Sequence, residues 1–161
     1  MIGCIIQARM GSSRLPGKVM EKLDQDNTVL SYVIRQLKHS KFLDDIVVAT
    51  TSLKRDEVIV DFLEREGIKY FCGDEENVLD RYYQCAKKFG FSEIIRITSD
   101  NPLIDYEIVD TVVEHFKSNN YDYITIDRPQ ISTFHQTYPV SYTHLRAHET
   151  LRYLVCRLLL E

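Results

Sequence analysis

No apolar run in this 161-residue sequence approaches the ~20 consecutive residues that a membrane-spanning helix needs, so we expect no membrane span. The N-terminus also lacks the basic region that precedes the apolar part of a secretory signal. Positive charge is not in excess, since the net charge is −4 at pH 7. A nucleic-acid partner is therefore not expected, because such binding needs a basic patch that neutralises phosphates. A local cluster of arginine and lysine can still bind a small anionic ligand.

Cysteine is scarce, and its spacing excludes the common metal and redox motifs. The four cysteines, Cys4, Cys72, Cys85 and Cys156, form neither a C-x-x-C pair nor a zinc-ligand pattern. Cys4 and Cys85 fall among apolar positions, so we expect them to be reduced thiols in the core. Together these absences predict a cytoplasmic protein.

Strand and helix signals alternate along the chain, which is long enough for one domain with a real core. Five short apolar runs predict strands at residues 2–6, 46–49, 68–71, 94–97 and 121–126. Between them, apolar residues recur at helical spacing in four segments. These residues are Val29, Leu30, Val33, Ile34 and Leu37; Val58, Ile59, Phe62 and Leu63; Val78, Leu79, Tyr82, Tyr83 and Ala86; and Ile108, Val109, Val112, Val113 and Phe116.

Local signals mark the ends of these helices. Asn27 or Thr28 is placed to cap the first helix, and Gly67 and Gly90 end the second and third. The strand–helix order predicts an α/β fold with a mostly parallel sheet and helices on both faces. Ligands of such sheets bind beyond the carboxyl ends of the strands, so the loops after strands one and four should carry the site.

The loop after strand one, residues 8–18, combines three cations with two glycines. Glycines let the backbone approach a ligand closely, and the cations supply countercharge for a triphosphate. A Walker A loop is excluded, because five residues separate Gly11 from Gly17 and Val19 follows the lysine. The dinucleotide fingerprint G-x-G-x-x-G is missing as well. The alternative is a solvated polar turn whose cations face water.

The loop after strand four presents one acid, Asp100, in the segment S-D-N-P. A carboxylate at the end of a parallel strand, opposite a phosphate-binding loop, is a natural ligand for Mg²⁺. By itself the segment is also a turn signal, in which an aspartate often serves as an Asx-type cap.

The first loop as a whole, IIQARMGSSRLPGKV, resembles the opening motif of the cytidylyltransferases that make CMP-sugars, which include the CMP-Kdo and CMP-acylneuraminate synthetases. It is most similar to the branch of the spore coat polysaccharide biosynthesis protein SpsF. The resemblance implies a Rossmann-like nucleotide-diphospho-sugar transferase fold in which this loop wraps CTP. The nucleotide-contacting residues that it implies here are Ala8, Arg9, Gly11, Ser12, Arg14 and Lys18. The three cations among them would hold the triphosphate.

Two further segments carry the resemblance. The family pattern G-D-x-P-L-I matches the chain at Asp100, which implies a catalytic Mg²⁺ ligand there, with Ser99 in place of the glycine. The segment that begins at Gly73 is similar to the pattern G-x-x-x-x-V-L-D-R-Y. The resemblance implies that Asp80 and Arg81 contact the base or sugar of the nucleotide. The alternative for this pair is an ordinary surface ion pair with a helix cap.

The resemblance extends from residue 1 to about Pro139. Residues 140–161 instead resemble translated sequencing-adapter read-through, so we expect a nucleotidyltransferase domain at 1–139 and a non-native tail at 140–161. His144 and His148 in that tail are not expected to bind metal, because no third ligand is evident. Family members continue well beyond this length, with a second metal-binding aspartate, sugar-pocket residues and dimer contacts. We therefore expect the fragment to be inactive and its full-length parent to be a homodimer.

The resulting hypothesis is a Mg²⁺-dependent enzyme that transfers CMP from CTP to a small sugar acid, with release of pyrophosphate, for surface or spore coat polysaccharide. Arg9, Lys18 and Asp100 are the expected catalytic residues. One alternative is a transferase that uses another nucleotide or acceptor, and another is a non-catalytic nucleotide-binding module. The hypothesis requires Lys18 and Asp100 to lie close enough to share one metal-bound triphosphate.

Overall fold

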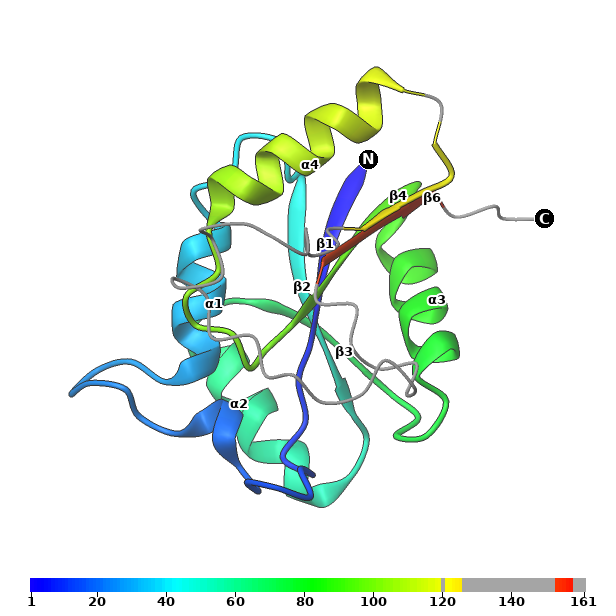
Figure 1. The fold of residues 1–161 in the computed structure, drawn as a ribbon. Helices are drawn as coiled ribbons and strands as arrows, with labels where there is room; N and C mark the ends of the chain where they lie inside the picture. Colours follow the sequence, from blue (N-terminus) through cyan, green and yellow to red (C-terminus); the bar gives the residue numbers. More distant parts are fainter. Residues whose placement is uncertain (120, 126–152, 158–161) are drawn as a thin grey trace.

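The described residues of the computed structural model, 1–119, 121–125 and 153–157, contain one six-stranded sheet (Figure 1). The strands are β1 (Ile2–Gln7), β2 (Asp45–Thr51), β3 (Lys69–Gly73), β4 (Glu93–Thr98), β5 (Tyr123–Thr125) and β6 (Tyr153–Arg157). Their order is β3-β2-β1-β4-β6-β5. The strands β1 to β4 are mutually parallel, and β6 runs antiparallel to both of its neighbours. The predicted mostly parallel sheet is therefore confirmed.

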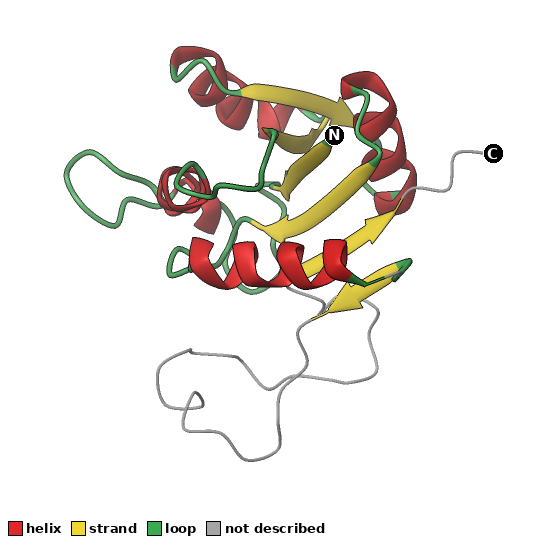
Figure 2. Cartoon of the chain, turned by 90° about the horizontal axis from the view of Figure 1, so that it is seen from above, coloured by secondary structure: helices red, strands yellow, loops and turns green. Residues whose placement is uncertain are grey.

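Helices cover both faces of the sheet, as predicted (Figure 2). They are α1 (Val29–Leu37), α2 (Glu57–Arg65), α3 (Val78–Phe89) and α4 (Tyr106–Ser118), with short 3-10 turns η1 (Lys18–Met20) and η2 (Lys54–Asp56). Apolar side chains of α1, α2 and α4 pack on one face in a single cluster. On the other face α3 packs over a second cluster. In the described part of the chain, no helix combines the length and apolarity that crossing a bilayer requires.

The helix ends follow the local signals. Thr28 caps α1, and its hydroxyl accepts a 3.2 Å hydrogen bond from the Ser31 N–H. Gly90 ends α3 in the left-handed conformation, with φ 71°, and Gly67 has φ 64° just after α2. Side chains with a Cβ adopt this conformation only at a cost, which explains glycine at both stops.

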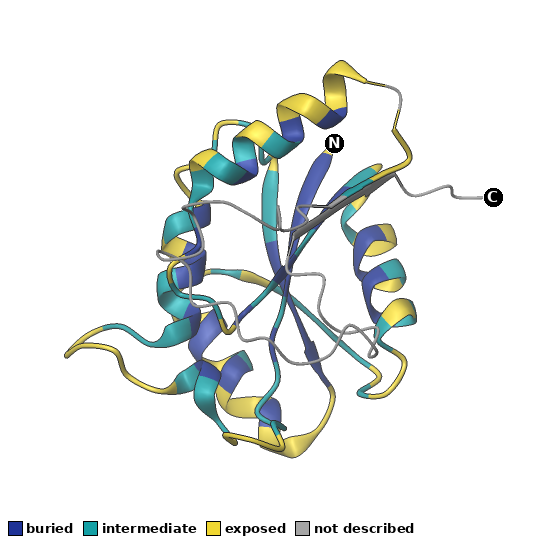
Figure 3. Ribbon diagram, in the orientation of Figure 1, coloured by how far each residue is buried: buried dark blue, intermediate teal, exposed yellow. Residues whose placement is uncertain are grey.

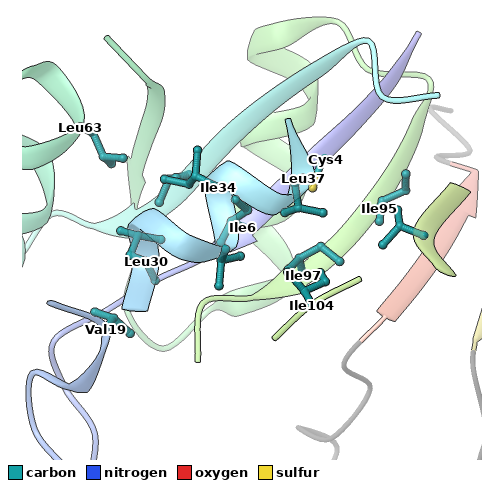
Figure 4. Packing of buried hydrophobic residues seen from close by; sticks show 14 of the residues in the cluster. Cys4, Ile6, Val19, Leu30, Ile34, Leu37, Leu63, Ile95, Ile97 and Ile104 are labelled. Atoms are coloured by element: carbon teal, nitrogen blue, oxygen red, sulfur yellow. The ribbon is translucent and has the colours of Figure 1, made fainter. Parts of the chain in front are cut away.

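The larger core lies between the sheet and the helices α1, α2 and α4 (Figures 3 and 4). Leu30, Leu37 and Leu63 are fully buried there, against strand residues such as Ile6 and Ile97. Each such side chain contributes roughly 1.5–3 kcal/mol when removed from water. The predicted burial of the two core cysteines is also confirmed, since Cys4 and Cys85 are both fully buried.

Two apolar residues that we expected on buried helix faces are instead exposed. Leu79 is 81% exposed and Val58 is 43% exposed. Both lie in the first turn of their helices, beside the loop that leaves the preceding strand. Their neighbours in the same turns, Ile59 and Val78, pack against the core, so Val58 and Leu79 lie on the solvent side of these helices.

The segment 140–161, which we expect to be non-native, contributes only β6 to the described residues. The rest of the segment, with His144 and His148, lies outside them. Its non-native origin stays a prediction.

Candidate active site

Parallel strands end at the same edge of a sheet, so the loops after β1, β2, β3 and β4 meet there, at the lower end of the sheet in Figure 1. The register aligns the strand ends, because Gln7 pairs with Ala49 of β2 and with Thr98 of β4. This is the edge at which ligands of open α/β sheets bind. Both loops in which we expected the chemistry are part of it.

Backbone hydrogen bonds fold the first loop back on itself. The N–H of Gly17 donates to the carbonyl of Met10 at 2.9 Å, which closes the loop at its base. Gly17 has φ 78°, a conformation that favours glycine. Val19, in the following turn η1, is 2% exposed and anchors the end of the loop in the core. The loop thus has a fixed base and a solvent-facing tip.

Asp56 secures the start of this loop, and the sequence analysis missed it. Its carboxylate is fully buried at the end of η2. One oxygen accepts the N–H of Met10 at 2.6 Å, and the other accepts the hydroxyl of Thr51. An acid at the N-cap position of α2 is the signal that could have revealed it.

Lys18 and Asp100 meet across the site. The Nζ of Lys18 lies 2.7 Å from Oδ2 of Asp100 in an ion pair, and each side chain is about one-third exposed. Lys18 comes from the turn after the first loop and Asp100 from the loop after β4, 82 residues later. The expectation that these two groups converge is met. Their catalytic roles stay predictions.

A second charged cluster lies on the other side of the first loop. Glu75, from the loop after β3, pairs with Arg55 of η2 and lies 3.8 Å from the guanidinium of Arg9. A Cβ added at Gly11 would lie 3.0 Å from the Arg55 guanidinium and 3.2 Å from the Glu75 carboxylate. Gly11 therefore allows both side chains to pack directly on the loop. Arg55 and Glu75 were not identified from the sequence, because nothing local distinguishes them from surface charges.

The Asp80–Arg81 pair is not the surface ion pair that the alternative reading of the sequence expected. Arg81 is fully buried, so it is not part of a surface ion pair. Its Nη1 donates to the backbone carbonyls of Asp74 and Glu75, which holds the loop after β3 in place. Burial lowers the pKa of Arg81 below its ordinary value. Asp80 bonds along its own helix, accepting from Gln84 at 3.1 Å. Contact of this pair with a nucleotide stays a prediction.

The remaining predicted residues lie along the first loop. Ala8 is buried and its N–H donates to the carbonyl of Ala49, so it extends β1 by one residue. The Ser12 hydroxyl accepts the N–H of Leu15 at 3.3 Å, a bond within the tip. Arg14 lies at the exposed tip, beside Ser12.

A polar cluster lies just inside the site, on the sheet face that α3 covers. It consists of Gln7 at the end of β1, Arg96 and Thr98 of β4, and Tyr82 of α3. Gln7 Oε1 accepts from Tyr82 Oη and from Arg96 Nη2, both at 3.4 Å. The Arg96 guanidinium lies over the Tyr82 ring, with Cζ 5.4 Å from the ring centroid. Burial raises the pKa of Tyr82, which keeps it a neutral hydrogen-bond donor.

The donor set at Asp100 is compatible with Mg²⁺. The side chain is partly exposed and already bonds a cation, Lys18, through one oxygen. Among the described residues, no three His, Cys, Asp or Glu side chains group as a metal cage would require. A single carboxylate suits Mg²⁺, which is usually held by one or two carboxylates together with substrate phosphates.

The parallel sheet, with a cationic loop after its first strand and a carboxylate after its fourth, has the fold of the α/β nucleotidyltransferases. Residues 3–145 match the Cytidylyltransferase family, and the chain belongs to that family. A structure of a cytidylyltransferase from Leptospira borgpetersenii serovar Hardjo-bovis superposes with a TM-score of 0.77 at 31% identity, covering 97% of this chain and 60% of that chain.

Several curated proteins are similar to this chain in sequence. An uncharacterised protein of Methanocaldococcus jannaschii is 47% identical over 121 residues, 75% of this chain and 49% of that protein. The spore coat polysaccharide biosynthesis protein SpsF of Bacillus subtilis is 39% identical over 126 residues, 74% of this chain and 52% of that protein. A 3-deoxy-manno-octulosonate cytidylyltransferase of Leptospira interrogans is 34% identical over 109 residues, 67% of this chain and 43% of that protein. The chain thus spans about half the length of the curated relatives that it matches.

Proposed function

We propose that the full-length protein, in which residues 1–139 continue to the length of these relatives, transfers CMP from CTP to a sugar acid and releases pyrophosphate. The observation that carries the proposal is the 2.7 Å approach of Lys18 to Asp100 from two different strand ends. When a cation and a carboxylate lie this close to each other, both can act on the same metal-bound triphosphate. Membership of the cytidylyltransferase family supports CTP as the nucleotide.

The chain's own residues would act mainly by positioning and by charge. Arg9, Arg14 and Lys18 would hold the triphosphate and stabilise the pyrophosphate as it leaves. Asp100 would hold Mg²⁺, which would supply positive charge against the phosphate oxygens. A hydroxyl of the sugar would attack the α-phosphorus and lose its proton to water. As the new P–O bond forms, the bond from the α-phosphorus to the bridging oxygen would break in line, and pyrophosphate would leave.

A sugar acid is the acceptor that the relatives favour, since several of them are described as 3-deoxy-manno-octulosonate cytidylyltransferases. The similarity to SpsF supports a role in surface or spore coat polysaccharide. We further propose a homodimer in the cytoplasm, where CTP is available.

The test is pyrophosphate release by the full-length protein with Mg²⁺, a sugar acid and each of CTP, UTP, GTP and ATP. We expect CTP to give the highest kcat/KM. Clear preference for UTP or ATP would replace the nucleotide assignment, and CTP binding without pyrophosphate release would indicate a non-catalytic module.

The matched variants are Asp100→Ala and Asp61→Ala. Loss of the Asp100 carboxylate should lower kcat by at least about 100-fold, the scale of removing one electrostatic stabiliser. Asp61 is exposed on α2, away from the strand ends, so its variant should keep full turnover. Undiminished turnover by Asp100→Ala would remove this residue from the mechanism.

A further inference from the structure

The face of the sheet under α3 breaks the usual pattern of a parallel sheet at one place. Strands of such sheets are buried on both faces and are mostly apolar, as Ile5 and Ile94 are on this face. At the carboxyl ends of the two central strands, however, Gln7, Arg96 and Thr98 occupy the same face. Polar side chains at such positions need a reason, because burying them is costly unless hydrogen bonds compensate.

Arg96 is the least satisfied member of this cluster. Within the part of the chain that the structure describes, its buried Nε has no hydrogen-bond partner. There its Nη2 contacts the neutral Gln7 at 3.4 Å. Among the described residues, no carboxylate lies within ion-pair distance of Arg96, although five other basic groups have one. A half-buried guanidinium with unused donors is a site for an anion.

The guanidinium is nevertheless held in a defined orientation. The ring of Tyr82 lies beneath it, at 5.4 Å from Cζ, and gives a cation–π contact. Gln7 bonds both Tyr82 and Arg96, so one amide oxygen links the two side chains. The planar guanidinium of Arg96 is thus already oriented to bind a planar acceptor through two hydrogen bonds, as a carboxylate would allow.

The polar cluster also lies close along the chain to Asp100, the metal ligand of the proposed reaction. Arg96 and Thr98 share one strand face, and Asp100 follows two residues later. The backbones of Arg96 and Asp100 are therefore at most about 13 Å apart, since each of the four steps adds at most roughly 3.3 Å. A separation of this order is on the scale of one sugar and one phosphate.

We infer that Arg96 is a specificity-determining residue that binds the carboxylate of the acceptor sugar, with Gln7 and Tyr82 as positioning residues. This inference rests on the proposed function and deepens it. It assigns the acid group of the substrate to the face under α3, separately from the triphosphate at the first loop. The substrate class is therefore a sugar acid whose carboxylate lies near the hydroxyl that attacks phosphorus.

The experiment compares 3-deoxy-manno-octulosonate with its C1 amide as acceptors for the full-length protein, measured as kcat/KM for pyrophosphate release. In Arg96→Gln the preference for the acid over the amide should fall by about 10- to 100-fold, the range for hydrogen bonds to a charged group. The Kd for CTP should stay within about twofold. Arg96→Lys, which keeps the charge but loses the fork, should give an intermediate loss. Arg65→Gln, on the exposed part of α2, is the control and should behave as the unmodified protein.

Each outcome has a definite meaning. An equal loss for acid and amide in Arg96→Gln, or an unchanged preference, overturns the inference. If that variant does not fold, the Nε–H signal of Arg96 in the unmodified CTP-bound protein, assigned with Arg96→Lys, decides the question. It should shift on adding the acid but not the amide, and an unmoved signal overturns the inference. Absence of pyrophosphate release by the unmodified protein contradicts the proposed function, while the Nε–H signal still reports on carboxylate binding.

Discussion

The buried carboxylate of Asp56 offers a quantitative test of how the first loop is held. It is fully buried and accepts the Met10 N–H at 2.6 Å and the Thr51 hydroxyl. Hydrogen bonds to a charged group contribute about 1.5–3 kcal/mol each, and a partner left unsatisfied adds to the loss. Asp56→Ala should therefore lower the free energy of unfolding by about 3–5 kcal/mol, a large part of the 5–15 kcal/mol typical of a domain.

The assay is urea denaturation of Asp56→Ala, Thr51→Val and the double variant, followed by circular dichroism. Thr51→Val removes one of the two bonds and should cost about 1.5–3 kcal/mol, and the two changes should be non-additive because they share a hydrogen bond. Asp61→Ala on the exposed part of α2 should change stability by less than about 0.5 kcal/mol. A cost below about 1 kcal/mol for Asp56→Ala would refute the view that this carboxylate anchors the loop. Calorimetric titration should show a higher Kd for CTP in Asp56→Ala, because the backbone of the released loop no longer has one fixed conformation for the ligand to bind.

Two further predictions concern local conformation and thiol chemistry. Gly17→Ala and Gly67→Ala both place a Cβ on a residue with positive φ, 78° and 64°, so each should destabilise by about 1–2 kcal/mol in denaturant titrations. Only Gly17→Ala should also weaken CTP binding, and equal Kd values would contradict the role of the loop. Burial raises the pKa of Cys85 to about 12 and that of Cys4 further, so both stay protonated thiols at pH 8. Iodoacetamide at that pH should label the partly exposed Cys72 before Cys4 and Cys85, as mass spectrometry can show, and prior labelling of Cys4 would contradict its burial.

The regular elements could be predicted because their signals are local. The strands at 2–6, 46–49 and 94–97 are short, mostly apolar segments, and the structure extends none of them by more than two residues at an end. The predicted cap at Thr28 and the stop at Gly90 are confirmed for the same reason, because a cap depends on a few neighbouring residues. The order of the strands in the sheet is a tertiary property that no local pattern contains.

The candidate site could be predicted only where a long motif marked it. Lys18 and Asp100 were identified from their loops, and their meeting follows from the shared edge of parallel strands. Arg55 and Arg96 were missed because each is a single charged residue without a local pattern, and Asp56 because its place at a helix start does not reveal what it bonds. Their importance arises from partners 20 to 89 positions away, as with Arg55 and Glu75, Asp56 and Met10, or Arg96 and Gln7.

The charged side chains of the site pair with one another, but weakly enough that a ligand can replace one partner of a pair. Lys18 is matched by Asp100, while Arg9 and Arg55 share the single carboxylate of Glu75. These pairs set three cations against two carboxylates at the rim of the first loop. The pairs are partly exposed and each contributes at most about 1 kcal/mol, so a triphosphate can replace the carboxylates at little cost. The loops themselves do not depend on these pairs, because their backbone is fixed by bonds such as those of Met10, Gly17 and Ser99. Exchange of partners can therefore proceed without unfolding the loops that present them.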